Sequence, residues 1–254
     1  MNSWSRELAA AIRAARKAAE LALRYQPEIV VQTKPDKSPV TQADVECERL
    51  IAGLLTEEFP EDGVLGEEGA KVESRSGRRW IIDPIDGTRD YVRGNPLWAN
   101  MIALEADGDI VAGVVHLPGL GALYAASRGG GAFRNDARIR VSSKTSVEEA
   151  VLCFNAFSKL GGTSFRNQLM DWMARFWAVR GLGGTPDAMM VASGQAEIWI
   201  EPSASPWDFA AVKVIVEEAG GLFLNFDGGN NIYAGNGIAT TSAFEGEVRK
   251  LIGF

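Results

Sequence analysis

Carboxylates placed outside helical faces are the side chains of this sequence that could do chemistry. In WIIDPIDGTRDYVRG (residues 80–94) an apolar run leads directly into Asp83 and Asp86. Burying such a pair without partners costs several kcal/mol per charge, so either both are exposed or a cation lies between them. Acidic residues of the same kind occur at three further places, namely Glu67 and Glu68 in GEEG, Asp44 in VTQAD and Asp208 in SPWD.

Metal-assisted hydrolysis of a phosphate ester is the chemistry that these residues indicate. Hard divalent cations such as Mg²⁺ prefer oxygen ligands, and a cation makes converging carboxylates tolerable. At a strand end, Asp83 and Asp86 can share ions, and the carbonyl of Ile85 can join them. Gly87 lets the backbone approach a ligand, and its N–H and that of Thr88 can open a helix whose N-terminus binds phosphate. A metal-bound water is then the expected nucleophile.

Each acidic position also has an ordinary structural explanation. Asp44 is the fourth residue of Thr41-x-x-Asp, and Asp208 is the fourth residue of Ser205-x-x-Asp. Both patterns are typical of a capping box. The DPIDGT stretch is compatible with a simple turn, because Asp-Gly is turn chemistry. The acidic pair in GEEG suits a solvated loop. None of these positions is decisive by itself. Their order along the chain supports the interpretation as a metal-dependent site.

Composition and charge narrow the class of protein. The chain has 254 residues, 46% of them apolar and 23% charged, which is ordinary for one large domain or two tightly joined subdomains. A net charge of −7 argues against a nucleic-acid partner. No apolar run is long enough to span a membrane, and residues 1–25 predict an amphipathic helix instead of a signal peptide, so a cytoplasmic location is expected.

The cysteines and the histidine exclude other chemistries. Cys47 and Cys153 form no C-x-x-C pair, and we expect them to be free buried thiols. The single histidine, His116, lies in the alternating strand pattern DIVAGVVHLPGL. One histidine excludes any two-histidine metal site and disfavours a Ser-His-Asp triad.

Two helices and a run of strands are predicted to position the acids in the first part of the chain. Hydrophobic spacing predicts helices over 5–24 and 41–59, the second with Val45, Ile51, Leu54 and Leu55 facing inward. A polar loop over 33–40 joins the two helices. The strand predicted over 78–83 is followed by predicted antiparallel strands over 97–106, 110–117 and 123–127.

After about residue 143 the pattern changes to alternating helix and strand. Helices are predicted over 164–176, 186–194, 206–221 with a closing glycine pair, and 244–252. Extended segments are predicted over 176–183, 196–201 and 222–226. Helices, then antiparallel strands, then alternating elements indicate a layered α+β architecture.

The motifs in this order resemble the inositol monophosphatase family of Mg²⁺-dependent, Li⁺-sensitive phosphomonoesterases. The resemblance covers nearly the whole chain, through KPDKSPVTQAD, GEE, WIIDPIDGTRDYVRG, GVVHLPGLGALYAASRGGGAF and PWDFAAVKVIVEEAGG. It implies a layered αβαβα sandwich of α+β class and a homodimer. It also implies one structural unit in which subdomain 1–143 carries most metal ligands and subdomain 144–254 completes the site.

The resemblance further implies a set of metal ligands. One Mg²⁺ would be held by Glu67, Asp83 and the carbonyl of Ile85. A second would be held by Asp83, Asp86 and Asp208, and a third, weaker one would lie near Glu67. Two to three ions are therefore implied, with Mn²⁺ able to substitute.

Catalytic and binding roles follow from the same resemblance. The attacking water would be oriented by Glu67 and by Thr88, which pairs with Asp44. The amides of Gly87 and Thr88 would bind phosphate. Substrate contacts are implied for Asp86, Glu201 and Lys34.

The substrate is predicted from the residues around the motifs. Members of the family cleave inositol monophosphates, histidinol phosphate, fructose 1,6-bisphosphate or 3′-phosphoadenosine nucleotides. The sequence around the motifs, including Trp98 after GNPL, is most similar to that of the bacterial histidinol-phosphatase branch. One departure is Gly184, which stands where that branch tends to carry Asp. We predict histidinol phosphate as the substrate, with inositol 1-phosphate or another family substrate as the alternative. A non-catalytic scaffold is a further alternative.

Overall fold

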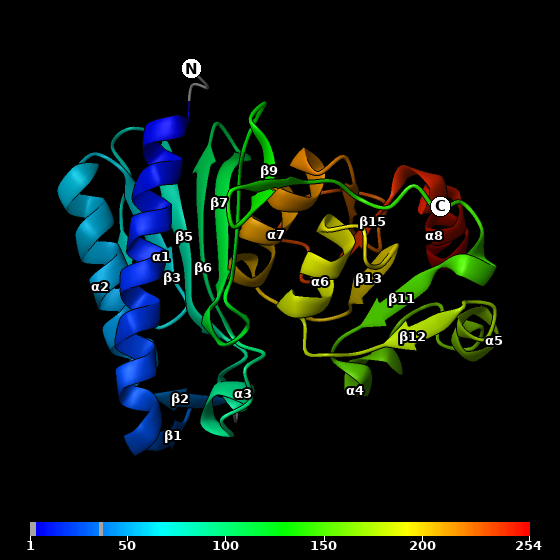
Figure 1. Ribbon diagram of the computed structural model, residues 1–254, viewed down its shortest axis with the longest axis horizontal. Helices are drawn as coiled ribbons and strands as arrows, with labels where there is room; N and C mark the ends of the chain where they lie inside the picture. Colours follow the sequence, from blue (N-terminus) through cyan, green and yellow to red (C-terminus); the bar gives the residue numbers. More distant parts are fainter. Residues whose placement is uncertain (1–3, 36–37) are drawn as a thin grey trace.

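Helix layers alternate with sheet layers across the molecule, as the computed structural model of residues 4–35 and 38–254 shows (Figure 1). This is the predicted α+β sandwich with layers in the order αβαβα. Residues 1–3 of the predicted N-terminal helical stretch and residues 36–37 of the predicted polar loop lie outside the described residues.

The outer helix layer consists of α1 (Ser5–Tyr25) and α2 (Gln42–Glu58). Buried alanines on α1 allow it to pack closely on its neighbours. Thr41 caps α2, because its hydroxyl accepts from the backbone N–H of Asp44. The expectation that Val45 faces inward is wrong, since its side chain is 40% exposed. Acidic residues, Asp44 and Glu48, occupy the buried face of α2 beside Ile51.

The large sheet lies under these helices (Figure 1). Its strand order is β10-β9-β8-β7-β6-β5-β3-β4, all neighbours antiparallel except the parallel pair β3 and β5. The central strand β5 is buried from Trp80 to Ile85, so its end must place acidic residues in the interior. The strands are β3 (Gly63–Gly66), β4 (Lys71–Val72), β5 (Arg78–Asp86), β6 (Ala99–Ala106), β7 (Asp109–Leu117), β8 (Ala122–Ser127), β9 (Gly131–Arg134) and β10 (Ala137–Ile139).

A short strand pair and a short helix lie at one end of this sheet, near the turn that follows β5. The hairpin of β1 (Val31–Thr33) and β2 (Pro39–Thr41) is antiparallel, and α3 (Thr88–Val92) follows β5. Figure 1 shows both at the same end of the large sheet.

The central layer and the second sheet come from the rest of the chain. Helices α6 (Thr185–Ala192) and α7 (Pro206–Glu218) lie between the sheets, and α7 packs on β6 and β7. The second sheet has the order β12-β11-β13-β15-β14. Its strands are β11 (Val151–Phe154), β12 (Ala178–Arg180), β13 (Ile198–Glu201), β14 (Leu222–Leu224) and β15 (Gly237–Thr240). Its outer face carries α4 (Phe157–Leu160), α5 (Leu169–Met173) and α8 (Glu245–Ile252).

The helix predicted over 164–176 is much shorter than expected. Only α5 is regular, and the residues before it form turns with bonds such as Gln168 N to Phe165 O at 3.1 Å. Phe165 is 1% exposed and its ring stacks edge-on against Phe226 at 5.1 Å. Phe165 is buried in the apolar cluster on the outer face of the second sheet, and this burial outweighs the helical preference of the segment.

Candidate metal centre and active site

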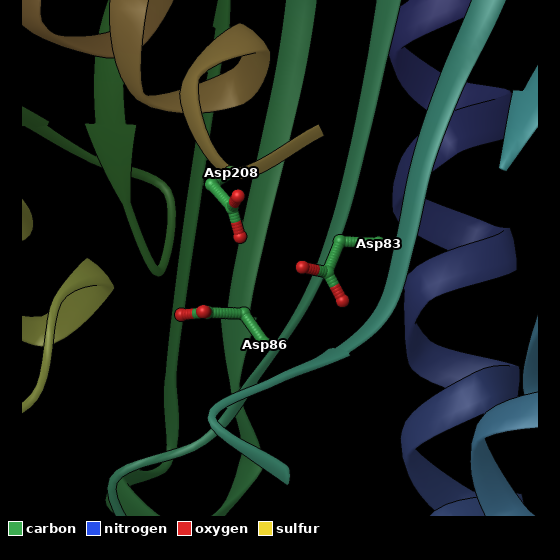
Figure 2. A group of neighbouring side chains, drawn as sticks. All are labelled: Asp83, Asp86 and Asp208. Carbon is green, nitrogen blue, oxygen red and sulfur yellow. The ribbon is translucent and has the colours of Figure 1, made fainter. Parts of the chain in front are cut away.

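Three carboxylates from two distant elements meet at one end of the large sheet (Figure 2). Asp83 and Asp86 lie in the last four residues of strand β5, and Asp208 lies in the first turn of helix α7. One oxygen of each lies within 4.8 Å of the others. The pairing of β5 with β6 shifts register between Asp83 and Asp86, and Asn100 Nδ2 donates to Pro84 O at 2.5 Å. This irregular strand end turns both aspartates toward Asp208.

The two predicted capping boxes form, and their hydrogen bonds also hold the carboxylates of Asp44 and Asp208 in place. Ser205 N donates to Asp208 Oδ2 at 2.6 Å, which holds this carboxylate at the start of α7, over the cluster. Thr41 N donates to Asp44 Oδ2 at 2.7 Å in the same way. The structural and the functional explanations of Asp44 and Asp208 are therefore compatible.

The clustered carboxylates repel one another when they are ionised. Burial raises the pKa of Asp83 well above its ordinary value, and the charges of Glu67, Asp86 and Asp208 raise it further. Burial and the charge of Asp86 likewise raise the pKa of Asp208. Burial raises the pKa of Asp86 to about 6, although a hydrogen bond from Thr185 acts in the opposite direction. Full ionisation of the cluster therefore requires positive charge close by.

The cluster is suited to a hard divalent cation. All three side chains offer oxygen, the ligand atom that Mg²⁺ prefers. Asp86 Oδ2 is buried and has no hydrogen-bond partner among the described residues, although buried carboxylate oxygens normally have one. A bound cation would satisfy this oxygen and would also remove the repulsion between the carboxylates.

Glu67 and Glu68 follow β3 and are held by Lys34 from the β1–β2 hairpin. Lys34 Nζ donates to Glu67 Oε1 at 2.9 Å and to Glu68 Oε1 at 2.7 Å. Burial lowers the pKa of Lys34, but both carboxylates outweigh burial and raise it above its ordinary value. Burial raises the pKa of Glu68 to about 7, against the hydrogen bond from Lys34. Glu67 lines the same cavity as the three aspartates.

The turn after β5 supplies the remaining predicted residues. Thr88 Oγ1 lies 3.2 Å from Asp44 Oδ1 and 3.2 Å from Ile85 O. Gly87 has a φ of 81°, which glycine adopts without strain, and an added Cβ would lie 3.1 Å from Leu97 O. Ile85, Gly87 and Thr88 all line the cavity. Asp44 lies behind Thr88 and does not reach the cavity wall.

The cavity that unites these residues has a volume of about 270 Å³. Sequence reasoning missed several residues of its wall. Asn155 is the clearest of them, because it directly follows β11, a buried strand parallel to β13, and strand ends of this kind commonly carry site residues. The other missed wall residues are Ser38, Pro39, Arg89, Asp90 and Gly183.

A smaller pocket of about 110 Å³ adjoins the cavity and shares Asp86, Asn155 and Asp208 with it. Glu201, at the end of β13, lies in this pocket and is 3% exposed. Asn155 Nδ2 donates to Glu201 Oε2 at 2.6 Å. Burial raises the pKa of Glu201 to about 7, although that hydrogen bond lowers it. Gly184 also lines the pocket, and a Cβ there would lie 3.0 Å from Asn155 Nδ2.

The other candidate residues lie away from the cavity wall. His116 Nδ1 is 3.5 Å from Ala15 O, in contact with α1. Cys47 and Cys153 are buried free thiols, as expected. A larger hollow of about 330 Å³ lies between α1 and α2, where Arg13 and Glu58 pair at 2.6 Å. Its charged side chains form no cluster of like charge that would call for a metal.

Comparison with known proteins identifies the relatives of this chain. The profile of the inositol monophosphatase family matches residues 3–252. A histidinol-phosphatase from Chlorobaculum parvum is 40% identical over 238 residues, which are 93% of this chain and 92% of that protein. An inositol-1-monophosphatase from Mesorhizobium japonicum is 40% identical over 199 residues, 76% of this chain and 74% of that protein.

Solved structures agree with the sequence relatives. The extragenic suppressor protein suhB from Bartonella henselae superposes with a TM-score of 0.90 at 33% identity, covering 98% of each chain. An IMPase/NADP phosphatase complexed with Mg²⁺ and phosphate superposes with a TM-score of 0.81 at 25% identity, covering 93% of this chain and 90% of that one.

The fold and the acidic site are those of a metal-dependent phosphoric monoester hydrolase. Within that class, the chain belongs to the inositol monophosphatase family, whose members depend on Mg²⁺ and act on small phosphate monoesters. None of the helices in the described part of the chain is long and apolar enough to cross a membrane.

Proposed function

We propose that this phosphatase hydrolyses histidinol phosphate. The observation that carries the proposal is Glu201, a buried carboxylate in the pocket beside the acidic cluster. With Asp86 and Asp208 engaged as metal ligands, Glu201 remains to face the leaving group. A carboxylate there favours an alcohol that bears an ammonium group over a neutral cyclitol. One such ion pair in a partly buried site contributes about 1.5–3 kcal/mol, or roughly ten- to a hundredfold in kcat/KM.

Inositol 1-phosphate is the second candidate, and Gly184 favours it. This glycine lines the pocket, and no carboxylate projects from its position. A cationic leaving group would therefore meet one acidic side chain fewer than in the histidinol-phosphatase branch. The relative from Mesorhizobium japonicum carries the inositol-1-monophosphatase name.

For the metal ligands we propose two principal ions. Glu67, Asp83 and the carbonyl of Ile85 would hold one, and Asp83, Asp86 and Asp208 would hold the other, with a third, weaker ion near Glu67. The geometry supports this proposal because all five residues line one cavity. Bound Mg²⁺ supplies charge neutralisation and activates water. We extend the proposal to Mn²⁺ as a substitute, since it takes the same oxygen ligands.

Thr88 and Asp44 are proposed to orient the attacking water. When Thr88 Oγ1 donates its proton to Asp44 Oδ1, 3.2 Å away, the hydroxyl is left to accept a hydrogen bond from water in the cavity. Glu67 would accept the second proton of that water. Asp44 is 0% exposed and is held by Thr41, so the direction of the Thr88 hydroxyl is fixed before substrate binds.

The phosphate is proposed to bind at the glycine turn. Gly87 has a left-handed backbone, and it lines the cavity together with Thr88. Their backbone N–H groups would donate to phosphate oxygens there. Lys34 adds positive charge near the same wall, although it is shared with Glu67 and Glu68.

Parallel steady-state kinetics test the substrate proposal. At saturating Mg²⁺, histidinol phosphate should give a higher kcat/KM than inositol 1-phosphate. In Glu201→Gln this preference should fall about tenfold while hydrolysis of an aryl phosphate changes little. A tenfold preference for inositol 1-phosphate in the unmodified protein would reject the histidinol assignment and leave the metal proposal intact. Failure to release phosphate from an aryl phosphate with Mg²⁺ would instead favour a non-catalytic scaffold.

The assembly is also a proposal. We propose a homodimer, as the family resemblance implies, and light scattering of the purified protein tests it. We further propose that residues 1–143 and 144–254 are subdomains of one unit. This division is supported by the boundary between the two sheets, which falls between β10 and β11, and by Asp208, which α7 of the second part presents to the first.

A further inference from the structure

Helix α2 carries two buried carboxylates one turn apart. Asp44 is 0% exposed and Glu48 is 3% exposed, and both lie on the face that packs toward β3 and β5. A carboxylate in such a position is costly unless hydrogen bonds satisfy it. Asp44 meets this requirement through Thr41 and Thr88. The partners of Glu48 are different, because they belong to the turn after β3.

Glu48 binds the backbone of the turn that carries Glu67. Its Oε2 accepts from Glu68 N at 2.7 Å and its Oε1 accepts from Ala70 N at 2.7 Å. Both oxygens of one buried carboxylate are thus used on one short turn. Hydrogen bonds from backbone N–H to an ionised carboxylate are among the strong ones.

The close approach of Glu48 depends on Gly66. A Cβ on Gly66 would lie 2.4 Å from the carboxylate of Glu48, so only glycine leaves room for it. Gly66 N also donates to Ala70 O at 2.8 Å, and Glu67 N donates to Ile82 O at 3.1 Å. The backbone on either side of the Glu67 side chain is therefore fixed from three directions.

We propose that Glu48 is a positioning residue that holds Glu67 in place for metal binding. This inference rests on the proposed role of Glu67 as a metal ligand. One turn of α2 then positions two groups of the cavity wall: Asp44 orients the Thr88 hydroxyl and Glu48 orients Glu67. Glu48 itself does not line the cavity, so it acts through Glu67 and makes no contact with the ion.

The variant Glu48→Gln tests this role without changing side-chain size. The amide keeps one acceptor oxygen and turns an NH₂ group toward a backbone N–H, so the turn should shift. Loss of such a supporting partner costs about 10–100-fold in metal affinity or activity. We expect Mg²⁺ affinity, measured by calorimetry without substrate, and kcat to fall within that range. The KM for substrate should change less than about threefold, because the phosphate contacts are untouched.

Glu197→Gln is the matched control for loss of a buried carboxylate. Glu197 is also 3% exposed and also accepts from a backbone N–H, that of Val151 at 2.6 Å, but it lies at the opposite end of β13 from Glu201. It should lower the Tm and leave Mg²⁺ affinity and kcat unchanged. Gly66→Ala is a second route to the same defect, because the added methyl group displaces the Glu48 carboxylate. It should reproduce the loss of Mg²⁺ affinity.

A double-variant cycle separates positioning from general stability. If Glu48 acts through Glu67, Glu48→Gln should lower Mg²⁺ affinity in the unmodified protein and have little further effect in Glu67→Gln. Losses that multiply in the double variant, or a Glu48→Gln variant that behaves like Glu197→Gln, would overturn the inference alone. Unchanged Mg²⁺ affinity and kcat in Glu67→Gln would overturn the proposed role of Glu67, and the inference with it.

Discussion

Asp83 of β5 and Asp208 of α7 bring carboxylate oxygens within 4.8 Å of each other, although a strand of the large sheet carries one and a helix of the central layer carries the other. Burial raises the pKa of Asp83, and the negative charge of Asp208 adds to this rise. The contact therefore destabilises the metal-free protein and becomes favourable only with positive charge between the two layers. The consequences can be measured in stability as well as in activity.

Asp83→Asn should nearly abolish activity while the fold survives. Asp83 is the proposed ligand shared by both principal ions, so we expect the largest loss of kcat among single ligand changes, at least about 100-fold. The Tm of the variant in EDTA should be slightly higher than that of the unmodified protein, because a repelling buried charge is removed. Steady-state kinetics and thermal unfolding in EDTA measure the two effects.

Asp62→Asn is the matched control for this prediction. Asp62 is equally buried at 2% exposure, but it pairs with Arg78 at 2.7 Å at the far end of β5. Removing its charge should lower the Tm in EDTA and leave kcat nearly unchanged. Near-normal turnover by Asp83→Asn would show that the assignment of the metal site is incorrect.

The stability of the metal-free protein should fall as the pH rises from 5 to 7.5. Burial raises the pKa of Asp86 from 3.8 to about 6 and that of Glu201 from 4.5 to about 7. A carboxyl group whose pKa is raised in the folded protein contributes stability at pH values below its ordinary pKa. This contribution is lost as the pH rises through the raised pKa. Mg²⁺ should offset the loss, so the difference in Tm between saturating Mg²⁺ and EDTA should grow across this range. A difference that shrinks with rising pH would contradict the raised values.

Activity should require a divalent cation. The ligand set contains oxygen only, so Mg²⁺ or Mn²⁺ should restore activity after EDTA treatment. Li⁺ should inhibit at millimolar concentrations, as the family resemblance implies. Phosphate release from an aryl phosphate measures both effects, and undiminished release by fully chelated protein would refute the metal mechanism.

Gly87→Ala should impair phosphate binding through the backbone. The residue has a φ of 81°, and the added Cβ would lie 3.1 Å from Leu97 O, so the turn must move. We expect a loss of about 1–3 kcal/mol in stability and a marked rise in KM. Gly94→Ala is the control, because Gly94 has a similar φ of 70° but open space at the Cβ position. Equal kinetic effects in both variants would reject the phosphate-binding role of the Gly87 turn.

The preference for a cationic leaving group should depend on pH through Glu201. Its carboxyl group has a pKa raised to about 7, so it is ionised above that pH and neutral below it. The ratio of kcat/KM for histidinol phosphate to that for inositol 1-phosphate should therefore rise between pH 6 and 8. Glu201→Gln should remove the part of this rise that the enzyme contributes. An identical pH profile in the variant would exclude Glu201 as the group responsible.

Local sequence was sufficient for the features that neighbouring residues decide. The DPIDGT turn and the Thr41 and Ser205 capping boxes each depend on contacts within a few residues, and all of them form as predicted. The family resemblance also indicated which acids should converge. Three of them, Asp83, Asp86 and Asp208, do so.

Tertiary structure alone decided the features that depend on packing between layers. Asn155 reaches Glu201 because β11 and β13 are neighbours in the second sheet, and Glu48 reaches the Glu67 turn because α2 lies against β3 and β5. Phe165 breaks the predicted helix because a distant aromatic ring offers it a buried position. Sequence spacing reports which side chains share a face of one element. It does not report which faces of separate elements meet, because that depends on the burial of apolar surface summed over the whole fold.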